Sequence, residues 1–140
     1  MQGASATEQL LQENNGANVR VFVVWEPVLA TDFAAPSTAA LARISDVRAS
    51  QYWDRKRVLS HLLGERDRST VVWDSIAVYA PGTLWQDTPP KPVYSSGPVR
   101  DVINGAKNAI KGLITGEVNP TGVISNEERH RLFPARVNVL

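Results

Sequence analysis

The chain has 140 residues, of which 43% are hydrophobic and 21% are charged, and its formal net charge is +1. These values are ordinary for one globular domain with a buried core, and so small a net charge does not favour a nucleic-acid partner. The chain contains no cysteine, which excludes thiol catalysis, disulfide exchange and cysteine-ligated metals.

The first 18 residues are mostly small and polar and include Asn14-Asn15-Gly16. They predict a flexible N-terminal arm with a turn of helix around residues 7–12. They have neither the basic nor the apolar region of a signal peptide, and no part of the chain is apolar over the length of a bilayer. We therefore expect a cytoplasmic protein without a membrane partner.

Residues 19–25, Val-Arg-Val-Phe-Val-Val-Trp, are apolar on both faces apart from Arg20. This pattern is typical of a central strand that is covered on both sides, in a parallel or mixed sheet with helices over it. Pro27 cannot donate to a strand ladder, so regular pairing should end about there. We expect a long loop over residues 26–36 and a helix that begins after Ser37 or Thr38.

Apolar residues recur at helical spacing after Ser37 and again over residues 55–63, where Asp54 is a good N-cap and Gly64 a natural end. Residues 70–80 form the second strong apolar segment. The helical segment between the two apolar segments predicts a βαβ crossover in which they are parallel neighbours. Residues 80–83, Ala-Pro-Gly-Thr, predict a type II β-turn.

The chain becomes helical again from Pro98, with one apolar face, and Gly116 should end this helix. Short strands are expected at residues 84–85 and 93–94. Residues 137–140 are apolar enough to pair with a strand or to dock. The predicted organisation is therefore an arm over residues 1–18, a domain over residues 19–116 and a C-terminal extension over residues 117–140.

Several short segments resemble those of a group of uncharacterised bacterial thioredoxin-like proteins, over roughly residues 19–114. They are Val24-Trp25-Glu26-Pro27-Val28-Leu29, Thr31-Asp32, Ala35-Pro36-Ser37-Thr38, Leu41-Ala42-Arg43, Gln51-Tyr52-Trp53-Asp54 and Val72-Trp73-Asp74. The resemblance implies a thioredoxin-like α/β fold, with a central mixed sheet flanked by helices.

In redox-active thioredoxins the central strand leads into a Trp-Cys-x-x-Cys loop at a helix start. By this resemblance Trp25 matches the end of the strand, and Leu29 and Asp32 fall nearest the cysteine positions. Neither residue can perform thiol chemistry, so the resemblance implies the scaffold without the redox activity. The same fold usually has a cis-proline facing the loop, and Pro92 is the candidate here.

Three of the four tryptophans precede an acid, in Trp25-Glu26, Trp53-Asp54 and Trp73-Asp74. If these segments converge, Glu26, Asp32 and Asp74 could form a carboxylate cluster that binds a cation or a polyol, or that performs acid/base chemistry. Alternatively, the tryptophans pack in the core, Asp54 caps a helix and Glu26 faces solvent. Asp74, inside an apolar strand pattern, needs a shifted pKa or a partner such as Arg43 or Arg48.

Other chemistry has less support in the sequence. A serine–histidine–acid triad has only His61 and His130 as its base, and there is no Gly-x-Ser-x-Gly motif. His61 lies off the apolar stripe of its expected helix, which is typical of a surface histidine. No metal site, cofactor or nucleotide-binding motif is indicated.

The leading hypothesis is a redox-inactive binding domain that recognises a peptide, a partner protein or a small molecule near residues 26–36. Its expected ligand-binding residues are Trp25, Pro27, Thr31, Asp32 and Pro92. The competing hypothesis is a small hydrolase or lyase that uses carboxylates as acid and base, with Glu26, Asp32 and Asp74 as the catalytic candidates. A third is an assembly module that forms a homo-oligomer through the C-terminal extension.

Overall fold

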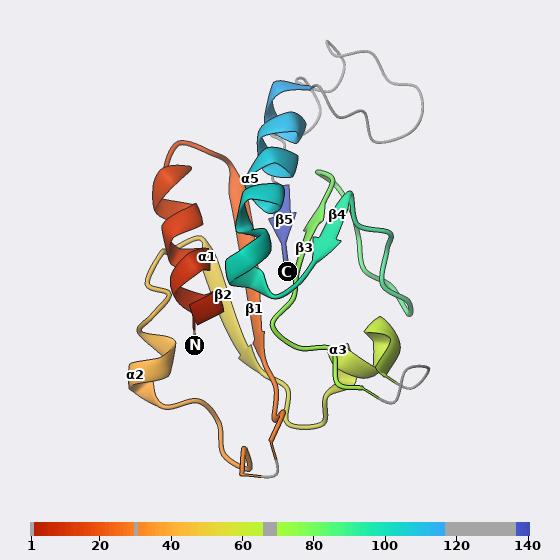
Figure 1. The fold of residues 1–140 in the computed structure, drawn as a ribbon. Coiled ribbons are helices and arrows are strands. Elements are labelled where there is room, and N and C mark those ends of the chain that lie inside the picture. Colours follow the sequence, from red (N-terminus) through yellow and green to blue (C-terminus); the bar gives the residue numbers. More distant parts are fainter. Residues whose placement is uncertain (1, 30, 66–69, 117–136) are drawn as a thin grey trace.

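A mixed sheet forms the centre of the fold, with its strands in the order β2-β1-β5-β3-β4 (Figure 1). The computed structural model describes residues 2–29, 31–65, 70–116 and 137–140. The strands are β1 (Val19–Trp25), β2 (Ala49–Trp53), β3 (Ile76–Tyr79), β4 (Tyr94–Ser96) and β5 (Val137–Val139). β1 pairs in parallel with β2 and β5, whereas β3 pairs antiparallel with β4 and β5. The predicted α/β class with a mixed sheet is confirmed.

The prediction that residues 19–25 and 70–80 pair as parallel neighbours is wrong. β5 lies between them, and Val139 is opposite both Val21 of β1 and Val78 of β3. Because β5 is parallel to β1 and antiparallel to β3, these two strands run in opposite directions. An apolar pattern shows that a strand is buried, but it does not show which strand is its neighbour.

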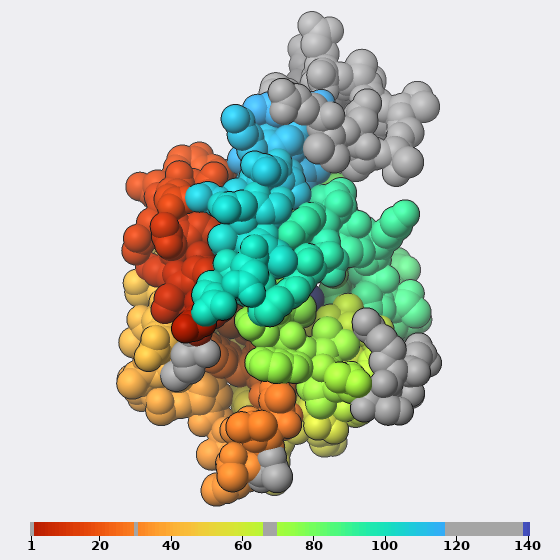
Figure 2. All heavy atoms as spheres, viewed as in Figure 1, coloured from red at the N-terminus to blue at the C-terminus, as the bar shows by residue number. Residues whose placement is uncertain are grey.

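Two helices cover one face of the sheet, α1 (Gln2–Glu13) and α5 (Val99–Thr115). They lie side by side, and in the space-filling view their atoms hide most of the strands behind them (Figures 1 and 2). Residues 2–13 are therefore a packed helix and not the flexible arm that the sequence predicted. The reason is that Leu10 and Leu11, each 1% exposed, extend into the core, while small residues fill the rest of the buried face.

The last helix follows its sequence pattern closely. α5 begins after Pro98, and Gly116 ends it with a φ of 77°, a left-handed conformation that glycine adopts readily. Ala106 and Ile110 are completely buried on the face toward the sheet. The expected apolar face is thus confirmed over most of its length, although Ile114 at its end is exposed.

The segment between β1 and β3 is less helical than expected. It contains α2 (Thr38–Leu41), α3 (Val58–Ser60) and a π-helical turn, η1 (His61–Glu65). The Ser37 hydroxyl accepts a hydrogen bond from Ala40 N at 3.3 Å, so the expected cap is confirmed. Residues 49–53 form β2, which the sequence pattern did not reveal because pairing with β1, and not local propensity, makes this segment a strand.

β1 and β3 also depart from the expected pattern. Val19 and Val21 are buried but Arg20 is exposed, so β1 has one well-covered face rather than two. Only Ile76–Tyr79 of residues 70–80 is a strand. Thr83 N donates to Ala80 O at 3.2 Å around Gly82, which has a φ of 78°, as expected of a type II turn. Trp85 is not in a strand but packs edge-on against the Tyr79 ring.

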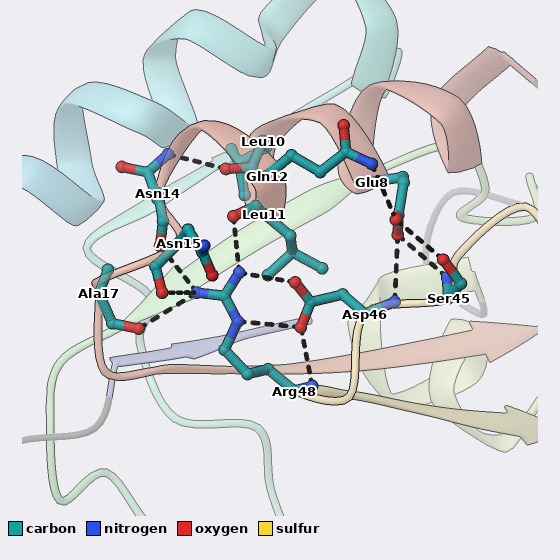
Figure 3. A network of polar contacts seen from close by, with 10 residues as sticks. All are labelled: Glu8, Leu10, Leu11, Gln12, Asn14, Asn15, Ala17, Ser45, Asp46 and Arg48. Atoms are coloured by element: carbon teal, nitrogen blue, oxygen red, sulfur yellow. Dashed lines mark hydrogen bonds and ion pairs between the residues drawn. The ribbon is translucent and has the colours of Figure 1, made fainter.

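Arg48, just before β2, ties the C-terminal end of α1 to the sheet (Figure 3). Its guanidinium donates to the backbone oxygens of Leu11 at 2.6 Å, Asn14 at 2.7 Å and Ala17 at 3.2 Å. The same group binds both carboxylate oxygens of Asp46, at 2.9 and 2.7 Å, and this bonding lowers the pKa of Asp46. One cation therefore adds a charged donor to three carbonyl oxygens at and just after the end of the helix, each of which also accepts a backbone hydrogen bond.

Candidate functional site

Two carboxyl groups meet where β1 and β2 end. The strand register pairs Trp25 with Trp53, so the residues that follow them, Glu26 and Asp54, emerge side by side at the same edge of the sheet. Asp54 N donates to Trp25 O at 2.8 Å, which holds the two chains together at this point. Two of the three Trp-acid segments therefore converge, because parallel strands end at the same edge.

Glu26 is half-buried, and its Oε1 accepts a hydrogen bond from Ser60 N at 3.0 Å. Burial, which disfavours the charged form, is the main cause that raises the pKa of Glu26 to about 7. The charge of Asp54, a hydrogen bond shared with it and the charge of Glu65 act in the same direction, whereas the Ser60 amide opposes them. Near neutral pH this carboxyl is therefore present in both its protonated and its ionised form.

Asp54 also organises the turn that follows it. Its Oδ1 accepts from Lys56 N at 3.2 Å, and its Oδ2 accepts from Leu59 N at 2.9 Å. The expected capping role is thus seen, although α3 starts only at Val58, after Arg57 in a left-handed conformation with a φ of 53°. Asp54 therefore serves both as a cap and as the neighbour of Glu26.

Glu65 completes the group that we call the carboxylate cluster, formed by Glu26, Asp54 and Glu65. It is 8% exposed, and its Oε1 lies 3.1 Å from Arg57 Nη2. Its other oxygen, Oε2, is buried and has no hydrogen-bond partner within the described part of the chain. His61 Nε2 lies 3.5 Å from this oxygen. Glu65 was not among the site residues predicted from the sequence.

The expected ligand-binding residues have structural partners or lie on the surface. Trp25 Nε1 donates to Gln51 Oε1 at 3.0 Å, and Gln51 in turn donates to the backbone. Asp32 Oδ2 accepts from Val28 N at 3.1 Å and from Leu29 N at 2.8 Å, so it shapes its own loop. Thr31 is exposed, and Pro27 and Pro92 are half-buried.

Asp74 lies before β3 and not inside it, at the edge of the fold where α1 and α5 begin. It has a left-handed φ of 47°, and its backbone oxygen accepts from Val99 N at 3.0 Å. Its expected partner Arg48 binds Asp46 instead. Among the described residues, the carboxyls that act on Glu26 are Asp54 and Glu65, and neither Asp32 nor Asp74 belongs to this set.

The proline expected to be cis can also be placed. Pro92 precedes β4, but the cis peptide bond found in the described ranges joins Gly97 to Pro98, between β4 and α5. Pro92 is therefore positioned as a loop residue before an edge strand, and its predicted role opposite residues 26–36 stays a prediction.

A groove of about 620 Å³ lies between the end of α1 and the outer side of α5. It is lined by Asn14, Asn104, Lys107, Asn108, Lys111 and Ile114. Lys107 forms an ion pair with Glu13, which offsets its positive charge. Most of the residues that line the groove are of polar type, and it lies on the helices rather than at the strand ends that carry the carboxylate cluster.

Within the ranges that the structure describes, no three His, Asp or Glu side chains are placed to hold a metal ion. The described helices include none that could cross a membrane. Comparison with protein-family models, curated proteins and solved structures gave no match for this chain.

Proposed function

We propose that the carboxylate cluster is an acid/base site and that Glu26 is its proton-transfer group, as in a small hydrolase or lyase. The observation that carries this proposal is the strand register, which sets Glu26 beside Asp54 at the end of two parallel strands. A carboxyl with a pKa of about 7 is suited to both donating and accepting a proton at neutral pH. Edges at which parallel strands end are also common places for ligand sites.

Each neighbour has a part in this chemistry. The hydrogen bond between Glu26 and Asp54 requires a proton between the two carboxyls, so Asp54 helps to keep Glu26 protonated. Ser60 N–H holds one oxygen of Glu26 in place when the group is ionised. Glu26 can therefore give its proton to a leaving oxygen and afterwards recover one from water.

The test has a chemical and a spectroscopic part. We would measure turnover of ester, glycoside and phosphoester substrates by the natural chain, by Glu26→Gln and by Asp101→Asn, a surface carboxyl paired with Arg100. We expect Glu26→Gln to lose turnover and Asp101→Asn to keep it. Carbon-13 NMR should find a Glu26 pKa near 7, and an ordinary value near 4.5 would reject the proposal.

A second candidate function is recognition of a peptide or partner protein by residues 26–36. The observation in its favour is that Leu29 and Phe33 in this loop are 66% and 80% exposed. Large apolar side chains that protrude together are typical of a contact surface. Replacement of both by serine should abolish partner binding without altering the far-ultraviolet spectrum, whereas Val47→Ser, at another exposed position, should leave binding intact.

For the scaffold, the proposal is a thioredoxin-like domain without redox activity, located in the cytoplasm. The support is that β1 leads into a loop and then a helix capped by Ser37, as the resemblance implies, while the chain has no cysteine.

A further inference from the structure

We propose that His61 is the second proton-transfer group of this site and that Glu65 is its positioning residue, an inference that rests on the proposed function. The starting point is the unpaired Oε2 of Glu65. A buried carboxylate oxygen without a donor is costly, and within native structures such a group usually has a function or a partner that comes close in a working state.

The local geometry identifies that partner. Arg57 binds Oε1 of Glu65 at 3.1 Å and fixes the carboxylate, while His61 Nε2 stands 3.5 Å from Oε2. The two residues belong to the same short turn, η1, and the measured separation shows that their side chains approach each other although Gly64 between them has a left-handed φ of 106°. A small rotation of the imidazole would bring an Nε2–H onto Oε2, and catalytic hydrogen bonds are often long before substrate binds.

This bond would fix the tautomer of the neutral histidine. With its proton on Nε2, His61 keeps a lone pair on Nδ1, and Nδ1 has no hydrogen-bond partner among the residues described. A histidine oriented through one nitrogen by a carboxylate, with the other nitrogen open, has the arrangement of a general base. His61 directly follows Ser60, whose backbone N–H donates to Glu26 at 3.0 Å, so the carboxyl of Glu26 reaches the residue next to the base.

The reaction that the pair supports is hydrolysis of a substrate with an oxygen leaving group. His61 Nδ1 takes a proton from water while the water oxygen bonds to the electrophilic atom of the substrate. The bond to the leaving oxygen then breaks, and that oxygen receives the proton of Glu26. His61 ends as a cation and Glu26 as an anion, and a proton moved from one to the other through solvent restores both groups.

The charges around His61 have defined positions. Glu65 faces it from the same turn, and Arg57 balances the charge of Glu65. Glu26 and Asp54 approach from the ends of β1 and β2. His61 therefore lies against a carboxylate that Arg57 balances, and the neighbouring Ser60 amide contacts the carboxyl of Glu26.

The test is the tautomer of His61, read from nitrogen-15 NMR of the full chain. The substitution His130→Gln leaves His61 as the single histidine. At a pH where the ring is neutral, we expect the Nε2–H form in this background. We expect the same form in Glu65→Gln, which keeps an acceptor oxygen, and a mixture of tautomers in Glu65→Ala.

A mixture or an Nδ1–H form in the His130→Gln background overturns the proposal, whether or not Glu65→Ala folds. With a substrate found in the turnover panel, His61→Gln should lose roughly 100-fold or more in kcat. The pKa of Glu26 is measured separately, by the carbon-13 NMR titration that tests the proposed function. A fixed His61 tautomer with an ordinary Glu26 pKa would reject the proposed function while leaving the orienting role of Glu65 in place.

Discussion

The guanidinium of Arg48 donates a hydrogen bond of 2.6 Å to the backbone oxygen of Leu11, 37 residues earlier in the chain. Together with the bonds to Asn14 and Ala17, this contact places a cation at the negative end of α1. The helix that the sequence presented as a loose arm is thus fixed to the entrance of β2. Glu8 adds to the same junction by accepting bonds from Ser45 and from Asp46 N (Figure 3).

The first prediction concerns this junction. Arg48→Met should lower the free energy of unfolding by about 2–4 kcal/mol, because the half-buried Asp46 carboxylate loses its cationic partner and three carbonyl groups lose a charged donor. Arg48→Lys should recover part of the loss, since an ammonium cannot reproduce the forked contacts. Urea denaturation would measure both variants. Arg100→Met, at an exposed ion pair, is the matched control and should cost less than about 1 kcal/mol.

The second prediction concerns the pH dependence of stability. The pKa of Glu26 is raised from 4.5 to about 7 on folding, so the folded state binds its proton more tightly than the unfolded state does. The stability that the folded protein gains from the tighter binding of the Glu26 proton is complete below pH 4.5 and is lost as the pH rises through about 7. Glu26→Gln should therefore flatten the stability profile across this window.

The size of this effect is limited by solvent, because Glu26 is only half-buried. We expect Glu26→Gln to be more stable than the natural chain at pH 8 by on the order of 1–2 kcal/mol. Chemical denaturation at pH 5, 6, 7 and 8 would show the difference. If the free energy of unfolding changed with pH by the same amount in both proteins between pH 5 and 8, this would contradict the half-buried environment described for the Glu26 carboxyl.

The third prediction concerns Gly105 in α5. Alanine normally favours a helix over glycine by about 1 kcal/mol. Here a Cβ on residue 105 would stand 2.7 Å from Cε2 of Tyr94, whose hydroxyl donates to Val102 O at 3.1 Å. Gly105→Ala should therefore destabilise the fold by about 1–3 kcal/mol. Asn108→Ala, on the exposed side of the same helix, should have no such cost, and thermal unfolding would compare the two.

The fourth prediction concerns β5. Val139 is 1% exposed between β1 and β3, whereas Val47 is 99% exposed. Val139→Ala should lower the free energy of unfolding by about 2 kcal/mol through the cavity it creates, and Val47→Ala should change it little. If urea denaturation gave equal stabilities for the two variants, residues 137–139 would not be the central strand.

The sequence predicted those parts of the fold that local chemistry determines. The apolar stripe and Gly116 defined α5, Ser37 defined the start of α2, and the turn at residues 80–83 followed from its proline and glycine. α1 was missed because most of its buried face consists of small residues, whose composition alone is typical of a flexible segment.

The candidate site was predicted less well because it depends on long-range pairing. Glu26 was named from the Trp-acid pattern, but its actual neighbours follow from the Trp25–Trp53 register and from a turn some forty residues later. The pairing of β1 with β2 could not be predicted from the weak strand pattern of residues 49–53. Asp32 and Asp74, expected on grounds of residue type, have backbone contacts of their own.

The position of β5 also bears on how the chain is made. It is the last of these five strands to be synthesised, yet it occupies the middle of the sheet. Until residue 139 has left the ribosome, the β1–β2 pair and the β3–β4 pair each present an open inner edge, which is a site for wrong association. Nascent chains stalled before this residue should therefore bind chaperones and resist native folding, and release of the last strand should trigger it.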